Sequence, residues 1–380
     1  MNVGIITFHF AHNQGAVLQC YALQKALTKM GHDVKVIDYC PGYHTIRYSS
    51  APNPFSMAIL GYKKEKNRKF TSRMRHMVRK FAKGIYINTT KKYKGREQNF
   101  SRFTKEHLNL TNKYKTIKAL RKNPPLLDAY VSGSDQLWNP ELVNGFFDPA
   151  YFLDFGSKDI RKITYAVSLK ESYTEQEKQS MKMLCENLDA ICAREKNSVA
   201  DELFEQNYTV CVDPTLLFDM EDYESITSKE TEEEPYIFVY GFQTSETMVE
   251  AITVISKELG IRVINGSPER VMIKDATNAY DYGPDVFLSY IKNAQFVITN
   301  SFHGTAFSVI FKKKFVTVAH TTRGKRMTEL LEKLELSGRI WRNAECDWRS
   351  EVDYTQADKK RNELKIQAKD YLNKNLNFKN

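Results

Sequence analysis

The chain has 380 residues, a length that allows two domains with sizeable cores. Its hydrophobic content of 42% and aromatic content of 12% are typical of a soluble globular protein, and no apolar run reaches the length of a membrane span. Met1–Phe10 lacks a basic start, so we expect it to form a first strand rather than a signal peptide, and we expect a cytoplasmic protein.

The charge is unevenly distributed, and the cysteines and histidines are dispersed. The net charge is +10, but residues 61–122 contain 21 Lys and Arg against 3 Asp and Glu, so a basic insert interrupts an acidic remainder. The six cysteines and eight histidines show neither C-x-x-C nor another metal-ligand spacing. We therefore expect reduced thiols, no metal and no cofactor.

Residues 1–228 predict a Rossmann-like lobe that opens with a βαβ unit. After the loop His9–Gln14, apolar residues from Ala16 to Met30 recur at helical spacing. The basic insert, about residues 55–122, is expected to be helical, and Pro124-Pro125 ends it. The predicted strands are Val3–Thr7, Val34–Asp38, Asp128–Val131, Ile163–Val167, Ala190–Ala193 and Val210–Val212.

Residues 229–350 predict a second Rossmann-like lobe, which follows the charged linker Lys229–Glu234. Its predicted strands are Tyr236–Tyr240, Ile261–Ile264, Phe296–Thr299 and Phe315–Val318, and its helices are Glu246–Leu259, Asp285–Asn293, Thr305–Phe311 and Lys325–Leu334. A polar helix from about Thr355 to Leu376 occupies the last segment, 351–380. Alternating strands and helices predict an α/β fold of two doubly wound lobes facing across a cleft.

The second lobe carries the most informative loop, Asn300-Ser301-Phe302-His303-Gly304. It places His303 after a buried strand and before a helix, which is where open α/β sheets bind ligands and where helix N–H groups attract anions. Downstream lie Arg323, Lys325 and Arg326, which could bind an anionic donor or could be surface charge. The alternative interpretation of the loop is a helix cap at Asn300 or Ser301 beside a packed histidine.

Three loops of the first lobe also follow predicted strands. The segment Gly133–Pro140 suits a sugar site, because Ser134, Asp135, Gln136 and Asn139 can pair with hydroxyls and Trp138 offers an aromatic face. Alternatively, Ser134 or Asp135 caps a helical turn.

The other two loops of this lobe contain Asn13-Gln14-Gly15-Ala16 and Arg194-Glu195-Lys196-Asn197-Ser198. The first lacks G-x-G-x-x-G, so it is a weak dinucleotide signal, and Asn13 is equally suited to cap a helix. In the second, Arg194 can bind a carboxylate or phosphate with two hydrogen bonds, or can form a surface ion pair.

Taken in order, these strings resemble the polysaccharide pyruvyl transferase family. The matching strings are N-Q-G-A-V-L-Q-C-Y-A-L, G-S-D-Q-L-W-N, R-E-K-N-S, V-D-P-T-L-L-F at Val212–Phe218, and G-P-D-V-F-L…I-T-N-S-F-H-G-T-A-F-S. The resemblance implies a GT-B-like pair of lobes. It also implies transfer of the enolpyruvyl group of phosphoenolpyruvate onto a sugar, which yields a cyclic pyruvate ketal and phosphate.

The resemblance also suggests roles for the candidate residues. His303 becomes the general acid that protonates the methylene carbon of the donor, a role typically worth about 10²–10⁴ in rate. Arg194, which matches the arginine of the family, is expected to bind the donor carboxylate or phosphate. The remaining donor-binding candidates are Asn300, Ser301, Gly304, Thr305, Arg323 and Arg326, and the acceptor-binding candidates are Asn13, Gly15, Ser134, Asp135, Gln136, Trp138 and Asn139.

The sequence departs from the family pattern at one position. Some members have R-L-H-G where this chain has Ser301-Phe302-His303-Gly304, so we expect Arg323 or Arg326 to supply the missing charge. Two alternatives stay open: a GT-B-like glycosyltransferase that uses a nucleotide sugar, and a non-catalytic carbohydrate-binding relative.

The basic insert mixes Lys and Arg with apolar residues but carries no nucleic-acid-binding motif. One interpretation is a solvated basic hairpin. The other is attachment to an anionic membrane at about 1 kcal/mol for each nearby basic side chain, which suits a lipid-linked acceptor in surface-polysaccharide (exopolysaccharide or capsule) synthesis. We therefore expect a cytoplasmic enzyme that is peripheral on the inner face of the membrane, with no nucleic-acid partner.

Overall fold

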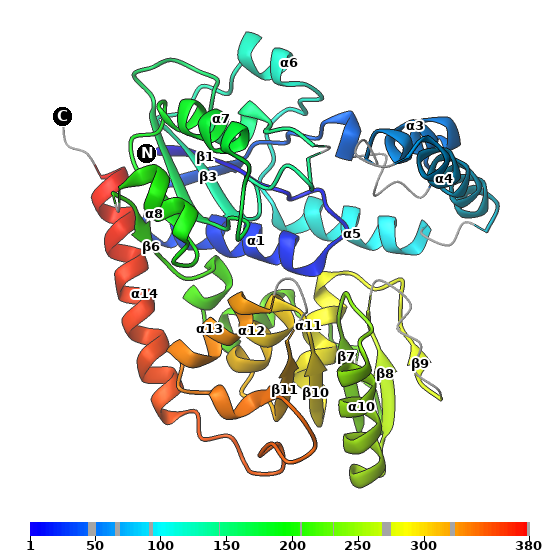
Figure 1. Cartoon of the computed structure of the whole chain (residues 1–380). Coiled ribbons are helices and arrows are strands. Elements are labelled where there is room, and N and C mark those ends of the chain that lie inside the picture. Colours follow the sequence, from blue (N-terminus) through cyan, green and yellow to red (C-terminus); the bar gives the residue numbers. More distant parts are fainter. Residues whose placement is uncertain are drawn as a thin grey trace. The chain divides into compact units, whose positions relative to one another are not determined.

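The computed structural model describes residues 1–44, 51–64, 69–90, 94–143, 145–205, 207–230, 232–267, 275–319 and 324–377. The chain forms two compact units, which are described separately. The first unit comprises Met1–His12, Ala16–Pro214 and Tyr371–Asn380, and the second comprises Asn13–Gly15 and Thr215–Asp370. Each unit contains a parallel sheet of six strands, as the predicted α/β fold requires (Figure 1).

The first sheet has the order β2-β1-β3-β4-β5-β6. Its strands are β1 (Asn2–Ile6), β2 (Asp33–Val36), β3 (Ala129–Asp135), β4 (Arg161–Val167), β5 (Cys192–Ala193) and β6 (Thr209–Val210). The helices of this unit outside the basic insert are α1 (Gln14–Lys29), η1 (Pro149–Phe152), α7 (Glu175–Cys185) and α8 (Ser198–Phe204). The six predicted strands are confirmed, with shifted ends.

Strand β3 extends beyond the predicted Asp128–Val131 because its serines are satisfied inside the protein. The hydroxyl of Ser132 donates to the carbonyl of Tyr151 at 2.7 Å, and that of Ser134 donates to the carbonyl of Ala166 at 3.0 Å. Both serines are fully buried. Polar residues therefore continue a buried strand here, which periodicity alone did not indicate.

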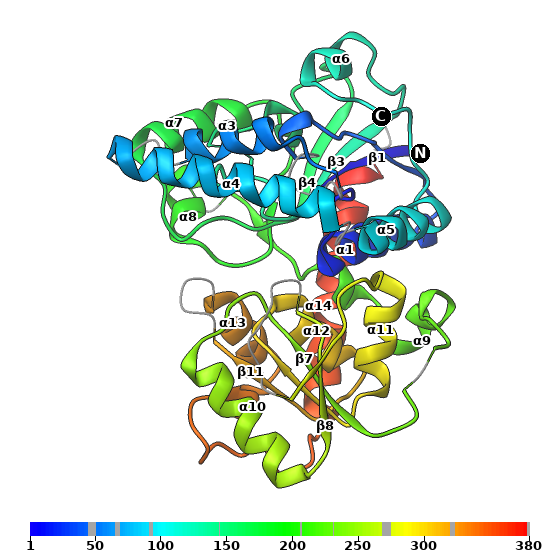
Figure 2. The ribbon, with the colours of Figure 1, turned by 90° about the vertical axis from the view of Figure 1, so that its right-hand side faces the viewer.

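The basic insert forms helices, as predicted, but it consists of two distinct parts. Its helices are α3 (Pro54–Lys64), α4 (Phe70–Thr90), α5 (Lys94–His107) and α6 (Ile117–Lys122). Helices α3 and α4 lie side by side (Figure 2), and a Cβ at Gly84 would come within 2.8 Å of Cα of Pro54. Helix α5 instead buries Arg96, Phe100 and Phe103, so it belongs to the folded body of the first unit.

The second sheet has the order β12-β11-β10-β7-β8-β9. Its strands are β7 (Tyr236–Tyr240), β8 (Arg262–Asn265), β9 (Thr277–Asn278), β10 (Phe296–Thr299), β11 (Phe315–Val318) and β12 (Ile340–Trp341). Its helices are η2 (Pro214–Leu217), α9 (Met220–Tyr223), η3 (Glu224–Ile226), α10 (Glu246–Leu259), α11 (Pro284–Asn293), α12 (Phe302–Ile310), α13 (Lys325–Lys333) and η4 (Ser337–Arg339). The two-residue strands β9 and β12 were not predicted, because they are too short to show a periodicity.

The boundary between the units falls at Pro214–Thr215, so the segment Lys229–Glu234, predicted as the linker, lies inside the second unit. The last helix, α14 (Thr355–Leu376), has the predicted bounds. Its final turns belong to the first unit, where the hydroxyl of Tyr371 donates to the carbonyl of Thr164 at 2.9 Å. In the described part of the chain, no helix combines the length and apolar character needed to cross a bilayer.

Candidate active site

The histidine loop lies at the point where the second sheet reverses its direction of winding. From β7 the chain first builds β8 on one side, and β10 then pairs with the other side of β7. A sheet of this kind binds ligands at the carboxyl ends of the two strands that flank the reversal. The segment Asn300–His303 follows β10 directly, so the predicted position of His303 is confirmed at this edge.

Hydrogen bonds fix the path of the chain between β10 and α12. The hydroxyl of Thr299 donates to the carbonyl of Tyr240 at 2.6 Å and accepts from the backbone N–H of Ser301 at 3.1 Å. The hydroxyl of Ser301 caps α12 by accepting from the N–H of Gly304. A Cβ at Gly304 would overlap the side chain of Thr299, so only glycine fits the first turn of this helix.

Asn300 connects the loop to the end of the neighbouring strand β7. Its side-chain oxygen accepts from the N–H of Phe242 at 2.9 Å, and its amide nitrogen donates to the carbonyl of Gln243 at 2.6 Å. A Cβ at Gly241 would overlap the amide of Asn300. Asn300 therefore holds two loops of the switch point in fixed register.

The imidazole of His303 lies in the first turn of α12 and is 7% exposed. The second unit includes Asn13–Gly15, and a Cβ at Gly15 would overlap the ring of His303. Two residues that the sequence assigned to different substrates, Gly15 and His303, therefore lie against each other. Because Gly15 has no side chain, the imidazole of His303 can pack directly against the backbone at this position.

The other donor-binding candidates are distributed as follows. Thr305 is fully buried, and its hydroxyl lies 2.9 Å from that of Thr317, so it packs α12 against β11. Arg326 is half-buried on α13. Arg323 lies outside the described residues. Ser301 and Gly304 shape the turn into α12, as described above. Thr305 lies within α12 and fixes this helix against β11.

In the first unit, Arg194 follows β5 and lies among three carboxylates. Its side chain is 3% exposed, and Nη1 contacts Oδ2 of Asp213 at 2.8 Å. Glu195 lies 3.5 Å away from Nε, and Asp135 lies 3.7 Å away from Nη2. Burial disfavours the charged guanidinium, but Glu195, Asp213 and Asp135 outweigh it and raise the pKa of Arg194.

This arrangement gives Arg194 a structural task beside the one predicted from the sequence. A donor anion that bound the guanidinium of Arg194 would also lie close to three carboxylates, whose negative charges would repel it. The assignment of Arg194 to the donor stays a prediction. The observed geometry shows Arg194 holding Asp213 and Asp135 at the carboxyl edge of the first sheet.

The rest of the R-E-K-N-S string shapes the loop. Glu195 accepts from the hydroxyl of Ser168 at 2.6 Å and from the N–H of Leu169 at 3.2 Å. Asn197 caps α8 by accepting from the N–H of Val199 at 2.9 Å. The alternative of a surface ion pair is excluded for Arg194 by its burial.

Asp213 is a residue of this cluster that the sequence analysis did not assign. Its carboxylate is fully buried, pairs with Arg194, and lies 3.2 Å from the hydroxyl oxygen of Ser134. The string V-D-P-T-L-L-F contains it, so a signal was available. An aspartate directly before a proline is also a common turn residue, and the pairing with Arg194 became visible only in three dimensions.

Trp138 was predicted to stack against a sugar, and the structure corrects this. The indole is fully buried, stacks on Phe152 with ring centroids 4.8 Å apart, and donates its N–H to the carbonyl of Tyr151 at 3.1 Å. Both its apolar and its polar demands are met by the core, which leaves no ring face for a ligand.

Asp135 is the most accessible of the acceptor-binding candidates at and just after the end of β3. Its side chain is 21% exposed, whereas Ser134, Gln136 and Asn139 are buried. Asp135 also has a backbone φ of 77°, in the left-handed region, which costs energy for a residue other than glycine. Strain of this kind is often kept at functional positions.

The chain was compared with family models, curated proteins and solved structures. A family model described as polysaccharide pyruvyl transferase matches residues 13–322. No curated protein matches the chain.

Among solved structures, UDP-GlcNAc 2-epimerase from Methanocaldococcus jannaschii, in complex with UDP-GlcNAc and UDP, is 14% identical over 100% of this chain and 94% of its own, with a TM-score of 0.47. UDP-N-acetylglucosamine 2-epimerase from Rickettsia bellii is 11% identical over 100% and 99%, with a TM-score of 0.46. Glycosyltransferase SsfS6 of Streptomyces sp. SF2575, complexed with thymidine diphosphate, is 12% identical over 97% and 96%, with a TM-score of 0.42.

Replacing Asp213 with asparagine tests the charge cluster. We expect Asp213→Asn to lower the free energy of unfolding by about 3 kcal/mol, because it leaves a buried guanidinium without its nearest carboxylate. Denaturant unfolding of purified protein measures the change. Asp135→Asn is the matched control, with a much smaller loss, because Asp135 is partly exposed and more distant. Equal losses in the two variants would contradict the assignment.

Proposed function

Because the chain belongs to the polysaccharide pyruvyl transferase family, we propose that it transfers the enolpyruvyl group of phosphoenolpyruvate onto two hydroxyls of a sugar. Membership of this family identifies the protein as a transferase that acts in polysaccharide pyruvylation. The donor, the cyclic ketal product and a lipid-linked acceptor are the finer parts of the proposal. The observation that carries it is the position of His303, in the first turn of α12 at the switch point of the second sheet.

His303 acts in this proposal as the general acid. Its proton goes to the methylene carbon of the donor, which becomes a methyl group and leaves a cationic centre on the neighbouring carbon. One sugar hydroxyl adds to that carbon and loses its proton. A second hydroxyl then displaces the phosphate, and its proton leaves with the released phosphate. The ketal carbon ends bonded to two sugar oxygens, to the carboxylate carbon and to the new methyl group.

The surroundings of His303 suit a small, doubly anionic donor. The N-terminus of α12 carries partial positive charge that favours an anion. The loop is held rigid through Thr299, Asn300 and Ser301, so little ordering is needed when the donor binds. A bound phosphate and carboxylate would in turn favour the protonated imidazole, which arms the acid when the donor is present.

In the first unit, Asp135 is our candidate for contact with the acceptor. It is the partly exposed carboxylate at the end of β3, and its position is fixed by Arg194 and by a strained backbone. A carboxylate can accept hydrogen bonds from neighbouring sugar hydroxyls and orient them for attack. The other polar residues after β3 then serve to hold this loop.

The hairpin of α3 and α4 supports membrane attachment and therefore a lipid-linked acceptor. Val78, Ile85 and Tyr86 are 59%, 45% and 52% exposed on α4. Helical spacing places the exposed cations Arg75 and Arg79 on the same face. Apolar side chains flanked by cations are typical of a helix that lies in the interface of an anionic membrane.

The donor can be identified by thermal unfolding. We expect phosphoenolpyruvate to raise the melting temperature, because a ligand at a hundred times its Kd stabilises the folded state by about 2.7 kcal/mol. UDP- and GDP-sugars serve as the comparison. Stabilisation by a nucleotide sugar and none by phosphoenolpyruvate would instead indicate a glycosyltransferase, and stabilisation by neither would indicate a carbohydrate-binding protein.

The role of His303 is tested by phosphate release. We expect His303→Gln to lower kcat/KM for phosphoenolpyruvate by about 10²–10⁴, because glutamine keeps hydrogen-bonding groups but cannot deliver the proton. Phosphate released across a panel of lipid-linked sugars gives the rate. His107→Gln, a change at a half-buried position on α5, is the matched control and should retain activity. Turnover by H303Q close to that of the unchanged protein would rule out the proposed acid.

Membrane attachment is tested by reversing charges on the hairpin, since α5 is part of the folded body and a deletion of the whole insert would damage it. We expect Arg75→Glu with Arg79→Glu and Lys83→Glu to weaken binding to anionic vesicles roughly a hundredfold, at about 1 kcal/mol for each charge. Vesicle sedimentation gives the affinity. Lys333→Glu with Lys359→Glu and Lys369→Glu, three exposed cations elsewhere, is the control. Equal binding by both triple variants would show that the hairpin is not the anchor.

A further inference from the structure

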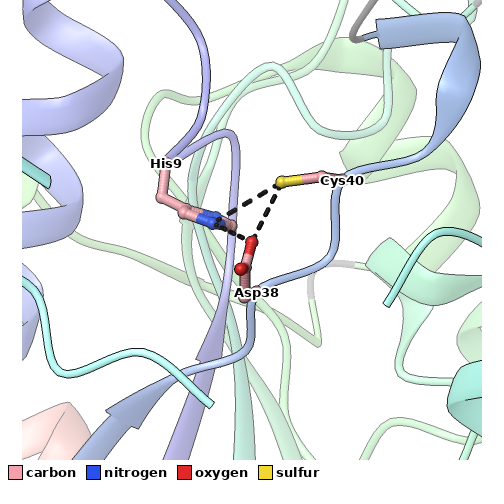
Figure 3. A group of neighbouring side chains, drawn as sticks. All are labelled: His9, Asp38 and Cys40. Carbon is pink, nitrogen blue, oxygen red and sulfur yellow. Dashed lines mark hydrogen bonds and ion pairs between the residues drawn. The ribbon is translucent and has the colours of Figure 1, made fainter. Parts of the chain in front are cut away.

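Three side chains with metal-binding atoms meet at one edge of the first sheet (Figure 3). Nε2 of His9 lies 3.1 Å from Oδ1 of Asp38, and Sγ of Cys40 lies 3.0 Å from the same oxygen. The third side of the triangle, from Sγ to Nε2, is 4.0 Å. His9 follows β1, and Asp38 and Cys40 follow β2, so two neighbouring parallel strands deliver the group.

The triangle has the size that a tetrahedral metal requires. Zinc binds His nitrogen and Asp oxygen at about 2.0–2.1 Å and Cys sulfur at about 2.3 Å, which places these atoms roughly 3.3–3.6 Å apart. The observed distances of 3.1, 3.0 and 4.0 Å bracket that range. Shifts of a few tenths of an ångström, with Sγ of Cys40 moving toward His9 and Oδ1 of Asp38 moving slightly away from both partners, would bring the three distances into this range.

The backbone prepares His9 for the role of a ligand. Nδ1 of its ring lies 3.2 Å from the carbonyl oxygen of Thr7, which can only accept a hydrogen bond. Nδ1 must therefore carry a hydrogen, which leaves Nε2 as the ring nitrogen that faces Asp38 and Cys40 and is available to a metal. A metal-binding histidine commonly donates its second ring N–H to a backbone carbonyl in this way.

Burial encloses the group on all but one side. His9 and Cys40 are 1% and 4% exposed, while the side chain of Asp38 is 15% exposed and provides the way in. The thiol of Cys40 donates its hydrogen to Oδ1 of Asp38. The nearby cation Lys113 is exposed, so solvent screens its charge.

We propose that His9, Asp38 and Cys40 bind one divalent transition-metal ion, with Zn²⁺ as the best match and a water in the fourth position. One nitrogen, one oxygen and one sulfur suit this borderline ion better than Mg²⁺ or Ca²⁺, which prefer oxygen alone. Binding replaces the thiol proton by the metal, so one proton is released to solvent for each ion bound at neutral pH. The sequence showed no metal-ligand spacing, because the three ligands come from two strand ends 29 to 31 positions apart.

The test measures metal uptake rather than catalysis. Full-length protein is freed of metal with a chelator and titrated with Zn²⁺, and bound metal is counted after desalting; Co²⁺ then serves as an optical probe. We expect about one Zn²⁺ for each chain. We also expect a thiolate-to-cobalt charge-transfer band, which arises only when sulfur is a ligand. Zn²⁺ should also raise the melting temperature of the unchanged protein.

Matched cysteine variants locate the site. Cys40→Ser should abolish the charge-transfer band and weaken Zn²⁺ binding by about a hundredfold or more, because even outer-shell partners cost 10–100-fold. Cys346→Ser, a change at a partly exposed cysteine of the second unit, should leave both unchanged. No uptake by the unchanged protein, a cobalt spectrum without the thiolate band, or equal binding by C40S would each overturn the proposal. If C40S does not fold, the cobalt spectrum of the unchanged protein decides the question by itself.

Discussion

The arrangement of both units depends on one constraint: all paired strands in each sheet run parallel. Parallel pairing sends the carboxyl ends of successive strands to the same edge, so loops far apart in the sequence meet there. In the second unit this brings the loop after β7 against the histidine loop after β10. In the first unit it gathers Asp135, Arg194 and Asp213 at the ends of three different strands. It also brings His9, which follows β1, beside Asp38 and Cys40, which follow β2.

At the edge of the second sheet, most of the polar residues shape the backbone. Thr299, Asn300 and Ser301 use their side chains on neighbouring main-chain groups, and Gly304 and Gly15 are required by close approach. These contacts fix the backbone of the loop that carries the imidazole of His303. Such a rigid support is what positioned proton transfer needs, since small displacements of a catalytic group are costly in rate.

The edge of the first sheet differs, because it contains a buried charged side chain, that of Arg194. A guanidinium that is 3% exposed is tolerable because a fully buried carboxylate contacts it and two more lie close by. The cluster therefore carries more negative than positive charge, and its exposed member is Asp135. That polarity favours hydroxyl donors over anions at this edge, in agreement with the acceptor role proposed for Asp135. The N-terminus of α12 in the second unit, by contrast, favours anions.

The sequence by itself determined the α/β class, most strands, the position of His303 at a strand end and the bounds of α14, because these follow from local periodicity and from strings of family type. It could not determine what long-range packing decides. Trp138 was predicted to stack against a sugar, but tertiary packing places it in the core, where it stacks on Phe152. The ion pair between Asp213 and Arg194 likewise follows from no local sequence pattern. The same is true of the unit boundary at Pro214–Thr215 and of the His9–Asp38–Cys40 group, since both arise from contacts between segments that only the folded sheet brings together.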